Sequence, residues 1–297
     1  MSQYGDRAAR WLVTGARGQL GSDLVRVLAE RGGDIRVTGL GRAELDVSDP
    51  AAVEAVVADL RPDVVVNAAA YTAVDAAESD EPAAVAGNVT GPANLARACA
   101  VHRVLMVHVS TDYVFSGQAT EPYPTDAATG PRSVYGRTKL AGERAVRELC
   151  PGSYVVRTAW VYGQTGGNFV RTMARLEAER DTLDVVDDQR GSPTWSRDLA
   201  AGLVALAGSD APCGVYHCTN GGDTTWYGLA RAVFEELGAD PSRIRPTTSD
   251  RFVRPAPRPA YSVLSDAAWL AAGLPAMPHW RDALHTAFAT VGAELRG

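Results

Sequence analysis

The chain has 297 residues, of which 46% are hydrophobic, and its 29 basic and 35 acidic side chains give a formal net charge of −6. This length is ample for two domains and a large core, so neither a metal ion nor a disulfide is needed to explain stability. The acidic balance and the absence of a Lys/Arg tract argue against a nucleic-acid partner, because binding to phosphates needs a basic face.

The sequence predicts neither a membrane span nor a secretory signal. No run approaches the ~20 apolar residues that cross a bilayer, and the opening segment MSQYGDRAARW carries charges without an apolar stretch. Four cysteines are scattered without C-x-x-C or zinc spacing: Cys99, Cys150, Cys213 and Cys218. We therefore expect a cytoplasmic protein with reduced thiols, no membrane contact and no nucleic-acid partner.

Short apolar runs alternate with segments of helical spacing in the first half of the chain. Strands are expected at residues 10–14, 34–40, 63–67, 105–110 and 154–162. Helices are expected from the glycines after the first strand to about residue 31, and at 50–60, 88–102 and 135–149. Strands that alternate with helices imply βαβ units and a parallel sheet. The expected fold is therefore a Rossmann-type, doubly wound α/β domain over residues 1–162 that binds NADP.

The second half of the chain has a different texture. Loops rich in Gly and Pro separate helices expected near residues 169–180, 196–208, 225–238, 265–272 and 279–290. This pattern predicts a smaller, discontinuous substrate-binding domain over 163–297, with 213–219 returning to the first sheet as an added strand. A cleft between the domains would lie at the carboxyl ends of the strands, where ligands bind in open α/β sheets.

The first turn between a strand and a helix is rich in glycine, with the sequence GARGQLG at 15–21. Glycine permits a tight turn and lets a pyrophosphate approach the N–H groups and the positive end of the helix. The spacing is G-x-x-G-x-x-G, unlike the usual G-x-G-x-x-G, and many such loops carry glycines for steric reasons alone. The position in the first βα turn favours dinucleotide binding.

The end of the second strand should meet the adenosine ribose of the cofactor. An NAD site places an acid there, whereas this chain has Gly39-Leu-Gly41-Arg42, with Arg17 in the glycine turn. A missing acid and two guanidiniums suit a 2′-phosphate, which predicts NADPH with NADH as the alternative. Arg42 as a solvated surface residue is the competing interpretation. Asp46 either holds the adenine amine or caps the helix that begins near residue 50.

Tyr135 and Lys139 are four residues apart on an expected helix, so they share one face. An ammonium group near a phenol lowers the pKa of the phenol from ~10 toward working pH. This makes Tyr135 a usable general acid for interconversion of a carbonyl and an alcohol. Ser110 and Thr111 end the preceding strand, where their hydroxyls can donate to the same carbonyl oxygen.

These motifs together resemble the extended short-chain dehydrogenases/reductases, and within them the dTDP-4-dehydrorhamnose reductases along nearly the whole chain. The resemblance rests on GARGQLG (15–21), NAAAYTAVDAAE (67–78), NVTGPANLA (88–96), STDYVF (110–115), RTAWVYG (157–163), DDQRGSPT (187–194) and RPAPRPAYSVL (254–264). It implies an NADPH-dependent oxidoreductase that reduces the 4-keto group of dTDP-4-dehydro-6-deoxy-L-mannose, that is, dTDP-4-dehydrorhamnose, to dTDP-L-rhamnose.

The resemblance also implies site residues. It makes Tyr135 the proton donor, lets Lys139 hold the nicotinamide ribose and places Thr111 in the catalytic group. The expected cofactor-binding residues are Gly15, Arg17, Gly18, Gln19, Leu20, Gly41, Arg42, Asp46, Val47, Ala70, Tyr71, Thr72, Tyr135 and Lys139. The expected substrate-binding residues are Thr111, Asp112, Trp160, Asn168, Arg254 and Arg258.

Several of these assignments have structural alternatives. Trp160 either stacks on the sugar or packs in the core. Asn168 either binds the phosphates of the substrate or caps the next helix. Arg254 and Arg258 either clamp the diphosphate or pair with surface acids.

The resemblance leaves other functions and partners open. One rival is a 4-ketoreductase for another dTDP-deoxysugar in antibiotic synthesis. A second rival is a non-catalytic NADP-binding protein like the regulatory subunit of eukaryotic methionine adenosyltransferase, against which intact Thr111, Tyr135 and Lys139 argue. Some relatives form homodimers that hold Mg²⁺ through interface glutamates, and the sequence does not identify such glutamates here.

Overall fold

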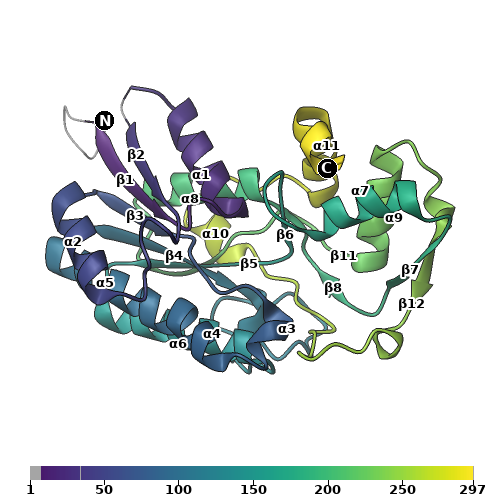
Figure 1. The fold of residues 1–297 in the computed structure, drawn as a ribbon, viewed down its shortest axis with the longest axis horizontal. Coiled ribbons are helices and arrows are strands. Elements are labelled where there is room, and N and C mark those ends of the chain that lie inside the picture. Colours follow the sequence, from purple (N-terminus) through teal and green to yellow (C-terminus); the bar gives the residue numbers. More distant parts are fainter. Residues whose placement is uncertain (1–7, 34, 297) are drawn as a thin grey trace.

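The computed structural model describes residues 8–33 and 35–296. A six-stranded parallel sheet lies at the centre of the larger of its two parts (Figure 1). Its strands are β1 (Ala9–Thr14), β2 (Ile35–Leu40), β3 (Val64–Asn67), β4 (Leu105–Thr111), β5 (Tyr154–Thr158) and β10 (Gly214–His217). They lie in the order β10-β5-β4-β3-β1-β2, and every neighbouring pair is parallel. The predicted Rossmann-type α/β fold is confirmed. Asp34, the expected start of the second strand, lies outside the described residues.

Helices cover both faces of this sheet, as Figure 1 shows. The helices on one face are α1 (Gln19–Glu30) and α8 (Ser196–Ala207), and those on the other are α2 (Pro50–Leu60), α5 (Gly91–His102) and α6 (Val134–Leu149). The central strand β3 is buried on both sides, with Val64 and Val66 in one hydrophobic cluster and Val65 in the other. This burial explains why β3 reads as a continuous apolar run.

Helix α8 packs against the central sheet, although its residues lie within the expected C-terminal domain. Its Leu199, Leu203 and Leu206 are fully buried in the cluster that also holds Leu24 of α1. The next strand, β10, pairs with β5 at the edge of the sheet. The chain thus returns to the first sheet from α8 through β10.

The prediction of one continuous strand over residues 154–162 is wrong, because the strand is interrupted before Trp160. Strand β5 ends at Thr158, and β6 (Val161–Tyr162) pairs instead with β9 (Thr194–Trp195) outside the central sheet. Trp160 has a φ of 48°, which is rare for a bulky residue and turns the chain sharply. Hydrophobic patterning does not reveal such a turn.

The smaller part of the fold has its own core and lies on the right in Figure 1. Its helices are α7 (Phe169–Glu179), α9 (Trp226–Glu236) and α11 (Trp280–Arg296). Its short strands pair as β7 (Leu183–Val186) with β12 (Ile244–Thr247) and as β8 (Arg190–Gly191) with β11 (Thr224–Thr225). The segment that connects β5 to α7 therefore carries the chain from one core to the other, past the carboxyl ends of the strands.

Candidate active site

The glycine turn lies where the strand order reverses, between β1 and its neighbours β2 and β3. Gly15 has a φ of 67°, and a Cβ there would lie 2.6 Å from the Ala69 nitrogen. A Cβ on Gly21 would lie 2.1 Å from the Gly15 oxygen. Only glycine fits at either position, because Gly15 packs against the chain after β3 and Gly21 packs against the backbone of the turn itself.

Helix α1 begins directly after this turn, with Gly18 as its N-cap, no side-chain capping bond and no acid in its first turn. Unpaired N–H groups and the positive end of the helix dipole make such a terminus suited to an anion. Gln19 and Leu20, the first two residues of the helix, flank this position. The residues present therefore fit the pyrophosphate of a dinucleotide.

The sequence predicted no acid at the end of β2, but the structure places the carboxylate of Glu44 there. Glu44 folds back so that its Oε2 accepts from the Gly41 nitrogen at 2.6 Å and its Oε1 pairs with Arg17. The turn that brings it back is closed by bonds from the Glu44 and Leu45 nitrogens to the Gly41 oxygen. This carboxylate was not predicted from the sequence.

Arg42 and Asp46 lie further out on the same turn. The Arg42 side chain is 90% exposed and lies 3.9 Å from Asp46, so the structure shows the solvated arrangement weighed in the sequence analysis. Asp46 accepts bonds from Ser48, and Asp49 caps α2 in its place. The idea that Asp46 caps α2 is therefore wrong. Val47 is buried beneath this turn.

The segment after β3 packs against the glycine turn through Ala68 and Ala69 and continues with Ala70, Tyr71 and Thr72. Its backbone is fixed by Asn88, whose side chain accepts from the Tyr71 nitrogen at 2.9 Å and donates to the Tyr71 oxygen at 3.1 Å. The same amide donates to Thr138 on α6. Asn88 lies in a π-helical turn, residues 86–90, of the kind often found at functional sites. Its motif was noted in the sequence, but its role was not predicted.

Tyr135 and Lys139 lie on the first turns of α6, which begins with Ser133 as a capping residue. Thr111 ends β4, and its hydroxyl donates to Asp112 Oδ1 at 2.9 Å. Thr111 lies within hydrogen-bonding reach of Tyr135, and this contact acts to lower the pKa of the phenol. The structure thus brings the three expected catalytic residues together at the carboxyl end of the sheet.

The expected lowering of the Tyr135 pKa by Lys139 is not observed. Burial raises the pKa of Tyr135 to about 12, and contact with the Thr111 hydroxyl only partly opposes the shift. The ammonium group of Lys139 donates instead to the Val109 oxygen at 2.7 Å. Its own pKa is lowered to about 8 by burial. Tyr135 is therefore a neutral phenol at neutral pH.

A buried ion pair stands one turn of α6 behind Lys139. Both carboxylate oxygens of Glu143 accept from Arg157 on β5, at 2.9 and 2.8 Å. Ser110 donates to the same carboxylate at 2.5 Å. The side chains of Glu143 and Arg157 are 3% and 5% exposed. This network ties α6 to β4 and β5, and the charge of Glu143 acts against the lowering of the Lys139 pKa.

A cleft of about 440 Å³ lies between the two cores. Trp160 and Trp226 form its wall as a parallel stack with ring centroids 3.5 Å apart. Gly191 lies behind Trp160, where a Cβ would come within 2.5 Å of the ring. Trp160 therefore lines the cleft and also packs against the core of the smaller part of the fold. Its partner Trp226 was not predicted from the sequence. The other residues that line the cleft are Asp75, Tyr113, Phe169, Met173, Asp184, Val185, Val186, Gln189, Phe252, Arg254, Arg258 and Pro259.

The other expected substrate-binding residues differ in whether they line the cleft. Arg254 and Arg258 both line the cleft, but Arg258 forms a two-pronged pair with Asp75 at 2.8 Å. Asp112 is buried beside Thr111, and burial raises its pKa to about 6. Asn168 caps α7, accepting from the Arg171 nitrogen, and does not line the cleft. The capping role considered for Asn168 is therefore observed.

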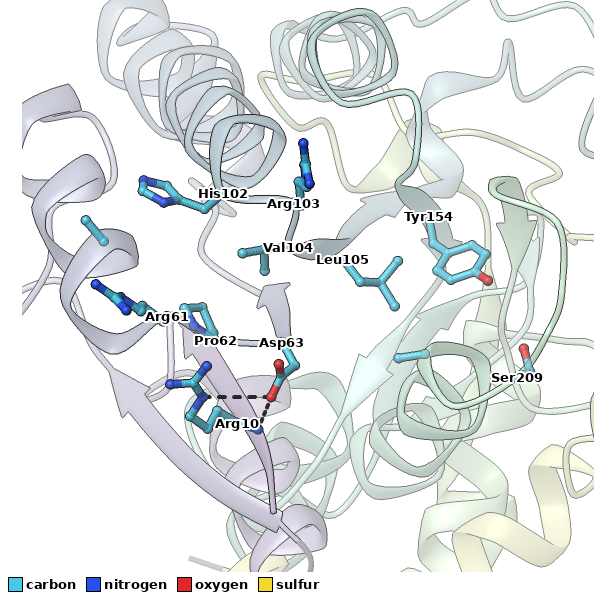
Figure 2. Close-up of a pocket in the computed structure, with 12 residues that line it drawn as sticks. Arg10, Arg61, Pro62, Asp63, His102, Arg103, Val104, Leu105, Tyr154 and Ser209 are labelled. Atoms are coloured by element: carbon cyan, nitrogen blue, oxygen red, sulfur yellow. Dashed lines mark hydrogen bonds and ion pairs between the residues drawn. The ribbon is translucent and has the colours of Figure 1, made fainter. Parts of the chain in front are cut away.

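A larger cavity, about 770 Å³, lies at the opposite, amino-terminal edge of the sheet (Figure 2). Arg61 and Arg103 line it as the residues that end α2 and α5. Cations at these positions complement the negative ends of the helix dipoles. Arg10 contacts Asp63 there, as Figure 2 shows. The charges of this cavity are explained by the fold, and it lies away from Tyr135.

The described part of the chain contains no helix long and apolar enough to cross a membrane. Within residues 8–33 and 35–296, no group of three or more His, Cys, Asp or Glu side chains could hold a metal ion.

The glycine turn suits a dinucleotide and lies where the strand order reverses, and the Thr-Tyr-Lys group lies at the same carboxyl edge of the sheet. Together they define an oxidoreductase of the short-chain dehydrogenase/reductase type. Comparison with known proteins narrows the class, since the family described as "RmlD substrate binding domain" matches residues 9–292. The chain belongs to this family, and the resemblance inferred from the sequence is confirmed.

The relatives are similar over nearly their whole length. A dTDP-4-dehydrorhamnose reductase of Streptomyces griseus is 56% identical, over 94% of this chain and 93% of that protein. A probable dTDP-4,6-dihydroxy-2-methyloxan-3-one 4-ketoreductase of Streptomyces antibioticus is 54% identical, over 94% of each chain. The crystal structure of dTDP-4-dehydrorhamnose reductase from Bacillus anthracis in complex with NADP superimposes with a TM-score of 0.91 at 35% identity, covering 95% of this chain and 99% of that one.

Proposed function

We propose that the protein uses NADPH to reduce the 4-keto group of a dTDP-4-keto-6-deoxysugar, with dTDP-4-dehydrorhamnose as the substrate and dTDP-L-rhamnose as the product. The observation that carries the proposal is the neutral Tyr135 beside Thr111, at the carboxyl edge of the sheet where the glycine turn also lies. The names of the relatives from Streptomyces griseus and Bacillus anthracis support the same reaction. Nucleotide sugars and NADPH are metabolites of the cytoplasm, so this function places the protein there.

The side chains divide the work as follows. NADPH, when bound, supplies the hydride. Tyr135, which has a pKa of about 12, carries its proton at neutral pH and donates it from Oη to the oxygen that becomes a hydroxyl. The Thr111 hydroxyl has a single proton, which it donates to Asp112 in the structure. Turned toward the substrate, it donates this proton instead to the same oxygen as negative charge develops there. Lys139, whose ammonium group donates to the Val109 oxygen, would supply positive charge and a further donor to the nicotinamide ribose.

The cleft residues fit a nucleotide sugar. The stack of Trp160 and Trp226 offers an apolar face for a deoxysugar or a base. Arg254 is exposed on the rim, where a guanidinium suits a diphosphate. Arg258 is held by Asp75 and keeps this loop against the first domain.

A second candidate is the reduction of a related dTDP-4-ketosugar in antibiotic synthesis. The 54% identical relative from Streptomyces antibioticus, named as a 4-ketoreductase of another dTDP sugar, favours it. The two functions differ only in the preferred sugar. Comparison of kcat/KM for the two ketosugars, each generated in situ with NADPH present, distinguishes them, and the preferred substrate should give the larger value.

The structure predicts that Arg17 governs the choice between NADPH and NADH. Arg17→Ala should raise the Kd for NADPH by about tenfold, because a charge-assisted bond to the 2′-phosphate is lost. The Kd for NADH should hardly change. Titration of cofactor fluorescence at fixed ionic strength measures both, since salt screens an exposed contact of this kind. Arg42→Ala is the matched control, and equal Kd values for both cofactors in the unaltered protein would refute the role of Arg17.

The pH dependence of the reduction should have two limbs. Lys139, with its pKa lowered to about 8, loses its positive charge as the pH rises, so kcat/KM should fall above about pH 8. Asp112, with its pKa raised to about 6, becomes protonated as the pH falls and then competes less for the single Thr111 proton, so kcat/KM should rise as the pH falls through about 6. A pH–rate profile at constant ionic strength measures both limbs.

The Glu143→Gln variant tests the assignment of the alkaline limb. Because the negative charge of Glu143 raises the pKa of Lys139, its removal should move that limb to lower pH. The acid limb should stay in place. An alkaline limb that does not move would show that Lys139 is not the group that titrates.

A further inference from the structure

Gln19 on α1 contacts a segment that lies 149 residues away in the sequence. Its Oε1 accepts from the Asn168 Nδ2 at 3.1 Å. Gln19 is the first residue of the helix whose uncapped N-terminus fits the pyrophosphate. The contact therefore joins the cofactor site to the first residue before α7.

Both ends of the Asn168 side-chain amide are hydrogen-bonded. Its Oδ1 accepts from the Arg171 nitrogen at 3.0 Å, which fixes the start of α7. Its Nδ2 donates to the Gly163 oxygen at 2.7 Å as well as to Gln19. An Asn amide has two N–H donors, so this set uses both of them. Asn168 therefore presents a fixed donor to Gln19.

The segment from Gly163 to Asn168 is also tied to α1 at a second point. Gln164 donates to Asp23 Oδ1 at 3.3 Å. Asp23 is itself buried and accepts from Ser196. Gly166 faces Gln19, because a Cβ on Gly166 would lie in ordinary contact with the Gln19 Cγ, at 3.4 Å. The segment thus lies beside the side chain of Gln19.

The two ends of the Gln19 carboxamide have different surroundings. Its oxygen is engaged by Asn168, whereas its Nε2 has no hydrogen-bond partner among residues 8–33 and 35–296. Fixing the oxygen end also fixes the direction in which the NH₂ group points. We propose that Asn168 is a positioning residue for the cofactor, which orients the Gln19 amide so that its Nε2 donates to the pyrophosphate of the bound dinucleotide.

The proposal assigns Asn168 to the cofactor and not to the phosphates of the substrate. It rests on the cofactor part of the proposed function only. It stays testable if the protein reduces a different sugar or no sugar, because the measurement is of NADPH binding and not of turnover.

The test is a double-mutant cycle on the Kd for NADPH, measured by fluorescence titration. Asn168→Ser keeps a good N-cap for α7 but is too short to hold Gln19. It should weaken NADPH binding by roughly threefold to tenfold, the value of one oriented hydrogen bond. Gln19→Leu should weaken binding at least as much. In the Gln19→Leu background, Asn168→Ser should cost nothing more, because its effect acts through Gln19.

Two controls separate positioning from general damage. Thr172→Ala removes a hydrogen bond to the backbone oxygen of Asn168, at the same end of α7, and leaves Gln19 unchanged. The Kd for NADPH should therefore stay within twofold. The far-UV spectrum and melting temperature of each variant report whether α7 remains folded. The same cost of Asn168→Ser in both backgrounds, or an unchanged Kd in the single variant, would overturn the proposal.

Discussion

Replacement of Tyr135 by Phe should lower kcat by about 10² or more, because only the donated proton is removed. The ring should keep its place, since it lies edge-on to Tyr113 with centroids 5.5 Å apart and does not need its hydroxyl to pack there. The Kd for NADPH should therefore stay close to that of the unaltered protein. Steady-state kinetics and a cofactor titration measure the two quantities separately.

Tyr113 offers the matched control for this experiment. It lies beside Tyr135 and lines the cleft, but it is not in the catalytic group. Tyr113→Phe should keep most of the turnover. A Tyr135→Phe variant with kcat near that of the unaltered protein would show that another group donates the proton.

Loss of Glu143 should have the largest effect on stability. Glu143→Ala leaves the Arg157 guanidinium buried without its carboxylate, a change that costs about 3–5 kcal/mol in similar pairs. The free energy of unfolding, measured by urea denaturation, should fall by that amount. Ser110 also loses its acceptor, which adds to the cost.

The double variant Glu143→Leu with Arg157→Leu is the control for this prediction. It removes both charges and leaves neither uncompensated, so it should recover much of the lost stability. A loss below about 1 kcal/mol in Glu143→Ala would mean that the pair is solvated and contributes little.

The central sheet and the proximity of the expected catalytic residues could be predicted from the sequence, because both depend on local signals. The apolar runs of buried strands, the glycine turn and the four-residue spacing of Tyr135 and Lys139 can each be recognised in one short segment. Their meeting at one edge follows from the rule that parallel strands end together. The helix at 50–60 was predicted to the residue, since proline opens it and Pro62 follows its end.

The errors concern contacts between distant segments or an unusual backbone. Glu44 was missed because its carboxylate reaches Gly41 only through a turn that folds the chain back. Trp226 stacks on Trp160 from a distant part of the sequence, and the turn at Trp160 has no sequence signal. The pKa of Tyr135 depends on burial and on where the Lys139 ammonium points, and spacing on a helix specifies neither.

The most direct test of the proposed reaction is to incubate the protein with NADPH and a dTDP-4-keto-6-deoxysugar generated in situ, and to identify the product by NMR. We expect one 4-hydroxy sugar, dTDP-L-rhamnose, for each NADPH consumed, and almost none with the Tyr135→Phe variant. NADPH that binds but is not consumed, with the ketosugar recovered unchanged, would contradict the assignment and leave a protein that only binds the cofactor.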